Sequence, residues 1–203
     1  MILSGNEIRR QVQEGRIEIT PFRPDHINPA SVDLTLGDEI GVYANWVEVP
    51  FLQSPNFVED GRGFRARDRV FDIKEEPYLL KYKISPEKGW VLRPGIGYLA
   101  HTAERVNTDF FVPILDGKSS IGRLFVKIHE TAGFGDPHFN GQYTLEVTAM
   151  HPIRIYAGMR FCQIRFHKIE GDVTPYEGNY AGDDARGPVA SKAWRQFKGS
   201  SPP

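Results

Sequence analysis

Apolar and polar residues alternate in short runs over most of the chain, a pattern typical of half-buried β-strands. Turn residues such as Asp116-Gly117 and Asn140-Gly141 separate these runs. Many short strands at this spacing predict a mainly β sandwich or barrel and not a βαβ sheet. We expect no helix between residues 90 and 170. The expected strands cover residues 16–20, 31–36, 90–92, 97–100, 110–112, 122–126, 142–147, 153–156 and 161–166.

One short helix is expected near the N-terminal end, over roughly residues 5–14. Ser4 and Glu7 have the spacing of a capping box, in which each side chain accepts a hydrogen bond from the other residue's backbone N–H. Ile8 and Val12 lie one turn apart and form an apolar stripe. Gly15 supplies a C-terminal stop.

Composition and charge narrow the class of protein. The chain has 203 residues, of which 40% are hydrophobic and 25% are charged, so a packed domain can form. The formal net charge of −1 argues against binding of a nucleic-acid polymer through a basic face. No stretch approaches the ~20 apolar residues of a membrane span, and the first residues lack the apolar core of a signal peptide. We therefore expect a cytoplasmic protein with no membrane partner.

Zinc chemistry is not expected from the residues present. Cys162 is the only cysteine in the sequence, so the chain cannot form an internal disulfide or a Cys-rich metal site, and we expect this residue to be buried in a strand. The zinc nucleoside deaminases need H-x-E and P-C-x-x-C motifs, and neither occurs. His129-Glu130 has no second histidine at helical spacing, so an H-E-x-x-H site is excluded.

Two stretches depart from the strand pattern within what we interpret as a single domain, residues 1–203. Residues 44–89 are charged and interrupted by glycine and proline, and we interpret them as a variable excursion. Their four arginines are either a substrate patch or solvated charges, and we favour solvated charges. Residues 172–203 are rich in Gly, Pro, Asp and Ser and are expected to form a mobile C-terminal lid or tail. The four arginines are Arg62, Arg65, Arg67 and Arg69.

The densest cluster of polar and glycine residues lies at 116–123, with the sequence Asp-Gly-Lys-Ser-Ser-Ile-Gly-Arg. Backbone N–H groups, two hydroxyls and two cations in one turn would suit a phosphate group. The spacing is not that of a P-loop. Taken alone, an ordinary polar turn is the simpler interpretation.

A candidate catalytic carboxylate lies in the strand expected at residues 142–147. Strand alternation places Gln142, Thr144 and Glu146 on the face opposite to Tyr143, Leu145 and Val147. Taken alone, Glu146 could be an ordinary outward-facing carboxylate.

Four segments, taken together, occur in an order and spacing that resemble one enzyme family. They are residues 1–22, residues 28–37, the turn 117–123, and residues 129–146 with the pattern His-x-Thr-Ala-Gly-Phe-x-Asp-Pro-x-Phe-x-Gly-x-x-Thr-Leu-Glu. The chain resembles the dCTP deaminase family of the trimeric dUTPase-like superfamily over residues 1–43 and 90–195. The resemblance implies a distorted β-barrel or jelly-roll subunit and a homotrimer with active sites at subunit interfaces. It also implies hydrolytic deamination of dCTP to dUTP and ammonia without zinc, with Mg²⁺ bound through the triphosphate.

The resemblance also implies roles for the matched residues at the reaction centre. Glu146 would act as general base and acid on a water that attacks C4 of cytosine, an effect typically worth ~10²–10⁴ in rate. Ser119 and Arg123 would hold the water, orient Glu146 and contact phosphate, and the charge of Arg123 would keep Glu146 ionised. The backbone carbonyl of Ala132 would help to fix the attacking water.

Other matched residues would bind the substrate. Asp136 would bind the deoxyribose 3′-OH, and Phe139 would pack beneath the sugar and leave no room for a 2′-OH. Gln163 would read the base edge. A tail that closes over the triphosphate would exclude water from the site. The residues that would hold the phosphates, directly or from this tail, are Lys118, Ser120, Tyr176, Tyr180 and Arg186.

Several positions depart from the family's pattern. Asn179 replaces a usual lysine in the tail, where Asp183 and Asp184 add negative charge. This leaves open a preference for a monophosphate or a 5-modified deoxycytidine nucleotide. Gly135 stands where an isoleucine is usual, and Glu130 where a small or neutral residue is usual.

The family resemblance leaves alternatives open. Some members also hydrolyse dUTP to dUMP and pyrophosphate, with Asp136 helping to activate a second water, and the small Gly133 after Ala132 allows this option. A plain dUTPase usually lacks a carboxylate ten residues after the motif aspartate, so Glu146 favours deamination. A non-catalytic nucleotide-binding module is the third alternative. Feedback inhibition by dTTP is known in the family, at a site that overlaps the active site.

Overall fold

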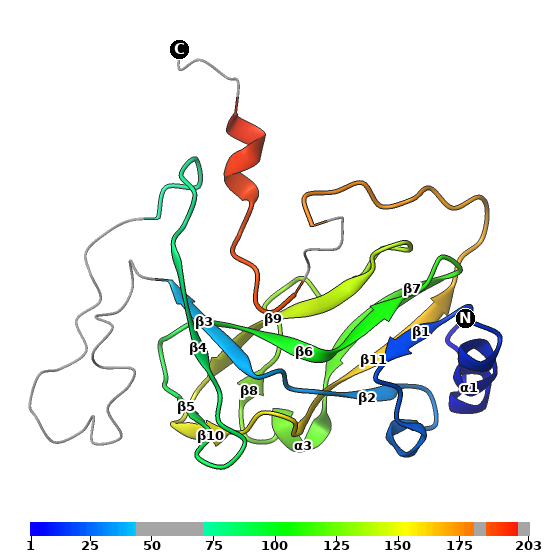
Figure 1. The fold of residues 1–203 in the computed structure, drawn as a ribbon, viewed down its shortest axis with the longest axis horizontal. Helices are drawn as coiled ribbons and strands as arrows, with labels where there is room; N and C mark the ends of the chain where they lie inside the picture. The colour runs from blue at the N-terminus through cyan, green and yellow to red at the C-terminus, as the bar shows by residue number, and fades with distance from the viewer. Residues whose placement is uncertain (44–70, 181–185, 199–203) are drawn as a thin grey trace, which may run out of the picture.

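Antiparallel strands are the main regular elements of the computed structural model, which describes residues 1–43, 71–180 and 186–198 (Figure 1). The mainly β class with one short N-terminal helix is confirmed. The helical elements are α1 (Gly5–Gln13), η1 (Pro24–His26), α3 (Ser119–Gly122) and η2 (Ala193–Phe197). The strands are β1 (Glu18–Thr20), β2 (Val32–Thr35), β3 (Glu39–Tyr43), β4 (Leu79–Lys83), β5 (Trp90–Leu92), β6 (Tyr98–Asn107), β7 (Phe111–Gly117), β8 (Val126–Lys127), β9 (Gly141–Ala149), β10 (Ile153–Ile155) and β11 (Arg160–Lys168).

The strands group into three sheets. The largest has the order β4-β3-β6-β9-β8, with β1 also paired to β6. A three-stranded sheet has the order β2-β11-β7, and β10 pairs with β5. Every pairing between these strands is antiparallel, as the sequence predicts. Strand β9 crosses the middle of the molecule, and residues 186–198 pass beside it (Figure 1).

The N-terminal helix confirms the prediction from the capping pattern, with one difference. The hydroxyl of Ser4 accepts a hydrogen bond from the Glu7 N–H at 3.3 Å. The Glu7 carboxylate does not complete the capping box but accepts hydrogen bonds from Arg10 at 2.7 Å and Gln11 at 2.8 Å. Ile8 is fully buried, and Gly15 has a φ of +69°, the left-handed conformation that ends many helices.

The prediction of a strand over residues 122–126, with no helix between residues 90 and 170, is wrong in part. Ser119–Gly122 forms the single helical turn α3, because the N–H of Gly122 donates to the Lys118 carbonyl at 2.9 Å. The strand that follows is only Val126–Lys127. Small residues in a turn allow this local hydrogen bonding, which an alternation of only a few residues does not reveal.

Part of the expected excursion belongs to the main sheet. Strand β4 lies within residues 44–89 and pairs with β3, from Glu39 opposite Lys83 to Tyr43 opposite Leu79. Neither strand was predicted, since both are short and carry charged residues. Residues 44–70, with the four arginines, lie outside the described residues.

The core fills the space enclosed by the sheets. Its largest fully buried side chains include Tyr98, Phe161 and Phe166. Cys162 is fully buried in β11, as expected, and burial raises the pKa of its thiol. Within the described residues, we find no helix that is long and apolar enough to cross a membrane.

Candidate active site

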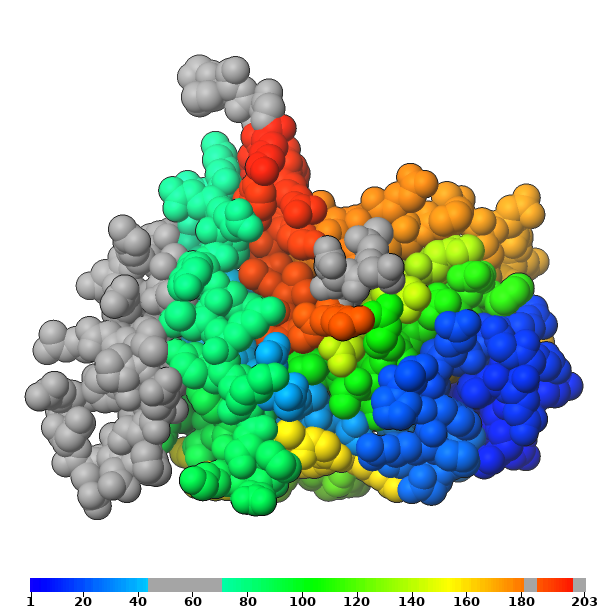
Figure 2. Space-filling model, in the orientation of Figure 1, coloured from blue at the N-terminus to red at the C-terminus, as the bar shows by residue number. Residues whose placement is uncertain are grey.

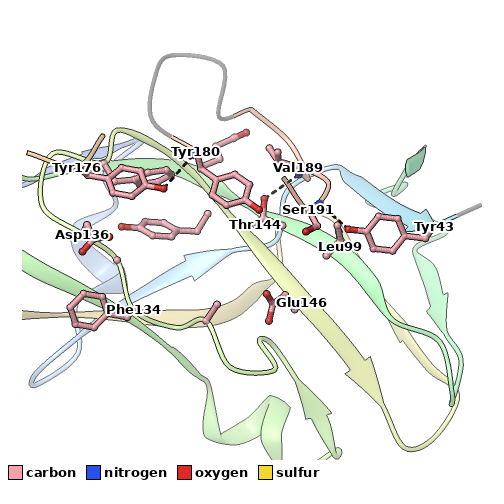
Figure 3. A pocket seen from close by; sticks show the side chains of 15 residues that line it. Tyr43, Leu99, Phe134, Asp136, Thr144, Glu146, Tyr176, Tyr180, Val189 and Ser191 are labelled. Carbon is pink, nitrogen blue, oxygen red and sulfur yellow. Dashed lines mark hydrogen bonds between the residues drawn. The ribbon is translucent and has the colours of Figure 1, made fainter. Parts of the chain in front are cut away.

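A cavity of about 340 Å³ lies between strand β9, the loop that precedes it, and the tail (Figure 3). Tyr176 and Tyr180 lie on one side of this cavity and Glu146 on the other (Figure 3). The predicted site residues that line it are Ala132, Asp136, Phe139, Glu146, Tyr176 and Tyr180. The structure thus brings together six of the twelve residues selected from the sequence.

Strand β9 places Glu146 in the cavity through its alternation. Tyr143, Leu145 and Val147 are buried in the core, as predicted. Gln142, Thr144 and Glu146 are half-buried and line the cavity from the other face. Two residues further along β9, Thr148 continues this outward face.

The carboxylate of Glu146 is held by the backbone of Glu130. Its Oε2 accepts a hydrogen bond from the Glu130 N–H at 2.9 Å. The Glu130 side chain in turn accepts a hydrogen bond from the Thr148 hydroxyl at 2.6 Å and pairs with Lys127 at 3.0 Å. First the Thr148 hydroxyl and then the Lys127 ammonium hold the pKa of Glu130 below its usual value.

Two glycines allow the loop before β9 to lie directly against β7. The Gly133 carbonyl accepts from the Leu115 N–H at 2.7 Å, and the Gly135 N–H donates to the Pro113 carbonyl at 2.8 Å. A Cβ at Gly133 would lie 2.7 Å from the Leu115 carbonyl oxygen, and one at Gly135 would lie 2.6 Å from the Tyr143 hydroxyl. The isoleucine usual at position 135 would therefore clash here. This close approach positions Ala132 and Asp136 at the cavity.

The turn after Asp136 presents Phe139 to the cavity. His138 has a φ of +66°, and its N–H donates to the Thr108 carbonyl at 2.9 Å. The Phe139 ring packs on Tyr143 with a centroid distance of 4.9 Å and meets the edge of Tyr176 at 6.3 Å. The cavity therefore has an aromatic wall beside a carboxylate.

The tail lies along the outward face of β9. The Gly187 N–H donates to the Gln142 side chain at 2.8 Å, and the Val189 N–H to the Thr144 hydroxyl at 3.1 Å. Residues 186–198 cover this part of the surface beside the β4 region (Figure 2). Arg186 is exposed and does not line the cavity, while Asp183 and Asp184 lie outside the described residues.

Residues of the tail and of β3 that sequence analysis missed also border the cavity. The Ser191 N–H donates to the Tyr43 hydroxyl at 3.0 Å, and burial raises the pKa of Tyr43. Lys192 does not line the cavity, but its ammonium lies 2.9 Å from the Asn179 carbonyl and 5.2 Å from the ring centroid of Tyr180, which does. A cation therefore lies beside the position where the family's usual lysine is missing. No local pattern predicts these contacts, because they join distant segments.

The other six predicted residues do not line this cavity. In a single chain they make contacts of their own: Lys118 pairs with the buried Asp33 at 2.5 Å, and Arg123 donates to the Ser119 carbonyl at 3.3 Å. The Gln163 amide donates to the Gly117 carbonyl at 3.1 Å and accepts from the Ser31 hydroxyl at 2.9 Å. Besides Arg186, the six are Lys118, Ser119, Ser120, Arg123 and Gln163.

Glu146 also borders a second, largely apolar cavity of about 250 Å³. Gly97, Leu99 and Val147 contribute to its wall. Across residues 1–43, 71–180 and 186–198, no group of three or more His, Cys, Asp or Glu residues could hold a metal ion.

Comparison with known proteins agrees with this geometry. The family model described as dCTP deaminase-like matches residues 2–169. Proteins named "dCTP deaminase, dUMP-forming" from Hathewaya histolytica and Clostridium acetobutylicum are 41% and 42% identical over 181 residues, which is 89% of this chain and 91% and 90% of theirs. One from Leptospira biflexa is 38% identical over the same length and covers 89% of this chain and 90% of its own.

A solved structure shares the fold. The crystal structure of 2′-deoxycytidine 5′-triphosphate deaminase from Agrobacterium tumefaciens superposes with a TM-score of 0.56 at 21% identity. The match covers 81% of this chain and spans less than half, 46%, of that chain. The family model and the relatives confirm the resemblance seen in the sequence: the chain belongs to the dCTP deaminase-like family.

Proposed function

We propose that this protein converts dCTP to dUMP, ammonia and pyrophosphate. The relatives' names support the prediction of a hydrolase that acts on dCTP. They favour the bifunctional alternative over our first expectation, in which dUTP is the final product. The observation that carries the proposal is the Glu146 carboxylate, which lines the cavity with its Oε2 held by the Glu130 N–H.

Deamination would begin with Glu146 as general base. It would take a proton from a water that attacks C4 of cytosine, and then pass a proton to the departing amino group. The C4–O bond forms, the C4–N bond breaks, and ammonia leaves. The hydrogen bond from the Glu130 N–H to Oε2 orients the carboxylate. Ala132 lines the same cavity and would offer its carbonyl to the attacking water.

Phe139 would select a deoxyribose sugar, and Asp136 would bind this sugar and take part in cleavage of the triphosphate. Phe139 presents a ring to the cavity, where it would pack beneath the sugar and leave no room for a 2′-OH. Asp136 would bind the 3′-OH and help to activate a second water at the α-phosphorus. That water forms a P–O bond, the bond to the β-phosphate bridging oxygen breaks, and pyrophosphate leaves.

The phosphate half of the site would come from another copy of the chain in a homotrimer. Ser119, Ser120 and Arg123 are exposed but do not line the cavity of their own chain. Beside them, Leu124 and Phe125 are 51% and 58% exposed, which suits a surface that another subunit covers. Lys118 and Gln163 belong to the same region and would act there with them.

Magnesium would enter on the triphosphate. Asp136 is a carboxylate at the cavity, and Mg²⁺ is commonly bound by one or two carboxylates plus phosphate oxygens and waters. The residues therefore fit a cation that the substrate itself carries and whose charge offsets that of the phosphates. Feedback by dTTP at this site stays a prediction.

Replacing Glu146 tests the proposed reaction. We expect Glu146→Gln to lower ammonia release from dCTP by about 10²–10⁴, with the thermal unfolding midpoint unchanged. Glu87→Gln, at an exposed turn remote from the cavity, is the matched control. A Glu146→Gln protein with the wild-type rate would overturn the assignment, and chromatography of the wild-type products would distinguish dUMP from dUTP.

The second cavity favours one further candidate function, the deamination of 5-modified deoxycytidine nucleotides. C5 of the pyrimidine is bonded to C4, so a C5 substituent would lie close to Glu146, which borders this cavity. A Cβ at Gly97 meets no atom within 4 Å, so Gly97→Leu would partly fill the cavity. If the candidate is right, this change lowers turnover of 5-methyl-dCTP more than turnover of dCTP. Equal effects on both substrates would contradict it.

A further inference from the structure

Glu130, one of the departures from the family's pattern, is joined to Glu146 by a closed ring of contacts. Thr148 and Glu146 lie two residues apart on the outward face of β9. The Thr148 hydroxyl donates to the Glu130 carboxylate at 2.6 Å, and the Glu130 N–H donates back to Glu146 Oε2 at 2.9 Å. Strand β8 adds a third contact to this ring. Lys127 lies opposite Thr148 in the β8–β9 register, and its ammonium forms an ion pair with the Glu130 carboxylate at 3.0 Å.

We propose that Glu130 and Thr148 are positioning residues for Glu146, and that their side-chain hydrogen bond fixes the backbone N–H that orients its carboxylate. This inference rests on the proposed function, since Glu146 must be the general base for its orientation to matter. Glu130 and Thr148 do not line the cavity that holds Asp136 and Phe139, but both line the second cavity, which Glu146 also borders. With dCTP, which has no substituent at C5, they would therefore act through Glu146 and not through direct contact with the sugar.

The ring matters because the Glu130 backbone has few other restraints. Glu130 follows β8 in an exposed bend, and its side chain is 42% exposed. A backbone N–H in such a segment can turn away unless a side chain holds it. The Thr148 hydroxyl ties this segment to β9, so the donor and the carboxylate move together. A general base must lie within hydrogen-bond reach of the proton that it removes, so loss of its orientation slows the chemical step.

The ion pair between Glu130 and Lys127 has a different role from the hydrogen bond to Thr148. Lys127 is 66% exposed, and exposed pairs of this kind contribute little to stability. The Lys127 charge offsets that of the Glu130 carboxylate, with which it pairs at 3.0 Å. The geometry therefore points to the hydroxyl–carboxylate bond as the main restraint and to Lys127 as a minor one.

Single-turnover ammonia release from dCTP tests the proposal. We expect Glu130→Ala and Thr148→Val to slow this step by about tenfold, the value for a lost hydrogen bond to a charged group. The KM for dCTP should stay within about twofold, because the substrate contacts are intact. Glu130→Gln keeps an oxygen that can accept from Thr148 and should recover most of the rate. Lys127→Met should change the rate by no more than about twofold.

The outcomes separate this inference from the proposed function. If Glu130→Ala and Thr148→Val keep the wild-type rate while Glu146→Gln is inactive, the positioning role is wrong and the proposed function stands. If Glu130→Gln is as slow as Glu130→Ala, the charge and not the hydrogen bond matters, which also contradicts the proposal. If Glu146→Gln is fully active, the proposed function fails first. Thr148→Val is nearly isosteric, so it provides the test even if Glu130→Ala folds poorly.

Discussion

Two regions of the molecule carry the family's polar motifs, and they differ in where their side chains point. Around β9, residues from the loop, the strand and the tail converge on one cavity that contains Glu146. Around the α3 turn, Lys118 and Gln163 are held by partners of their own chain, and Arg123 bonds the carbonyl of Ser119. One region is a cavity that three segments of the chain line together, and the other is a polar turn at the surface.

The difference indicates which region of the proposed enzyme carries out base chemistry and sugar binding and which region binds phosphate. The β9 cavity contains a carboxylate for the base chemistry and an aromatic wall for the sugar, and the only predicted phosphate ligands that line it are two tyrosines of the tail. The α3 turn contains cations and hydroxyls but no carboxylate suited to deamination. The β9 cavity has the carboxylate that the α3 turn lacks, and none of the predicted cations lines it, so we infer that the two regions complete each other between two copies of the chain.

Of the substitutions that test the different roles of the two regions, Asp136→Asn in the β9 cavity is expected to have the largest effect. Removing the carboxylate that would activate the second water should slow pyrophosphate release by about 10²-fold or more. Ammonia release should fall far less, so dUTP accumulates. Asp72→Asn, at an exposed position that does not line this cavity, serves as the control. Equal loss of both products would show that Asp136 acts in binding alone.

A smaller effect is expected from Arg123→Ala in the α3 turn. Loss of a charge-assisted contact to phosphate or to Glu146 should lower kcat/KM for dCTP by about 10- to 100-fold. Arg154→Ala provides a matched control, because Arg154 is exposed on β10 and donates to the Lys88 carbonyl at 2.7 Å. Steady-state kinetics would measure both. An Arg123→Ala enzyme with unchanged kcat/KM would contradict a role of the α3 turn in the active site, because the turn would then be only a surface feature.

The smallest expected effect concerns the tail. Thr144→Val removes the hydroxyl that accepts the Val189 N–H and should raise the KM for dCTP by about two- to tenfold, the range for one hydrogen bond. Thr144→Ser keeps the hydroxyl and should behave as wild type. Protease sensitivity of the tail provides a second measurement. If Thr144→Ser and Thr144→Val raise the KM for dCTP equally, the effect comes from the cavity wall and not from the tail.

Strand alternation predicts the outward face of β9 because this signal is local, and the structure confirms it for Glu146 and Thr144. Ala132 and Asp136 come from the family resemblance, and both line the same cavity. The helix α1 and most strands follow from capping residues and alternation in the same way.

What the sequence does not predict depends on contacts between distant segments. The hydrogen bonds of Tyr43 with Ser191 and of Lys192 with Asn179 join residues that no local pattern links. The α3 helix replaces an expected strand because local backbone hydrogen bonds override a short alternation. The role of Glu130 is hidden as well, since its backbone N–H and not its side-chain type contacts Glu146.

The central claim, a site shared between copies of the chain, is tested most directly by subunit mixing. Glu146→Gln and Arg123→Ala proteins, each impaired alone, would be dissociated together, reassociated at equal amounts and assayed for ammonia release. The reassociated mixture should recover up to about a quarter of the wild-type rate, the fraction of intact sites from random assortment in a closed ring. If mass spectrometry detects mixed oligomers and the rate stays at the level of the separate variants, the shared site is contradicted.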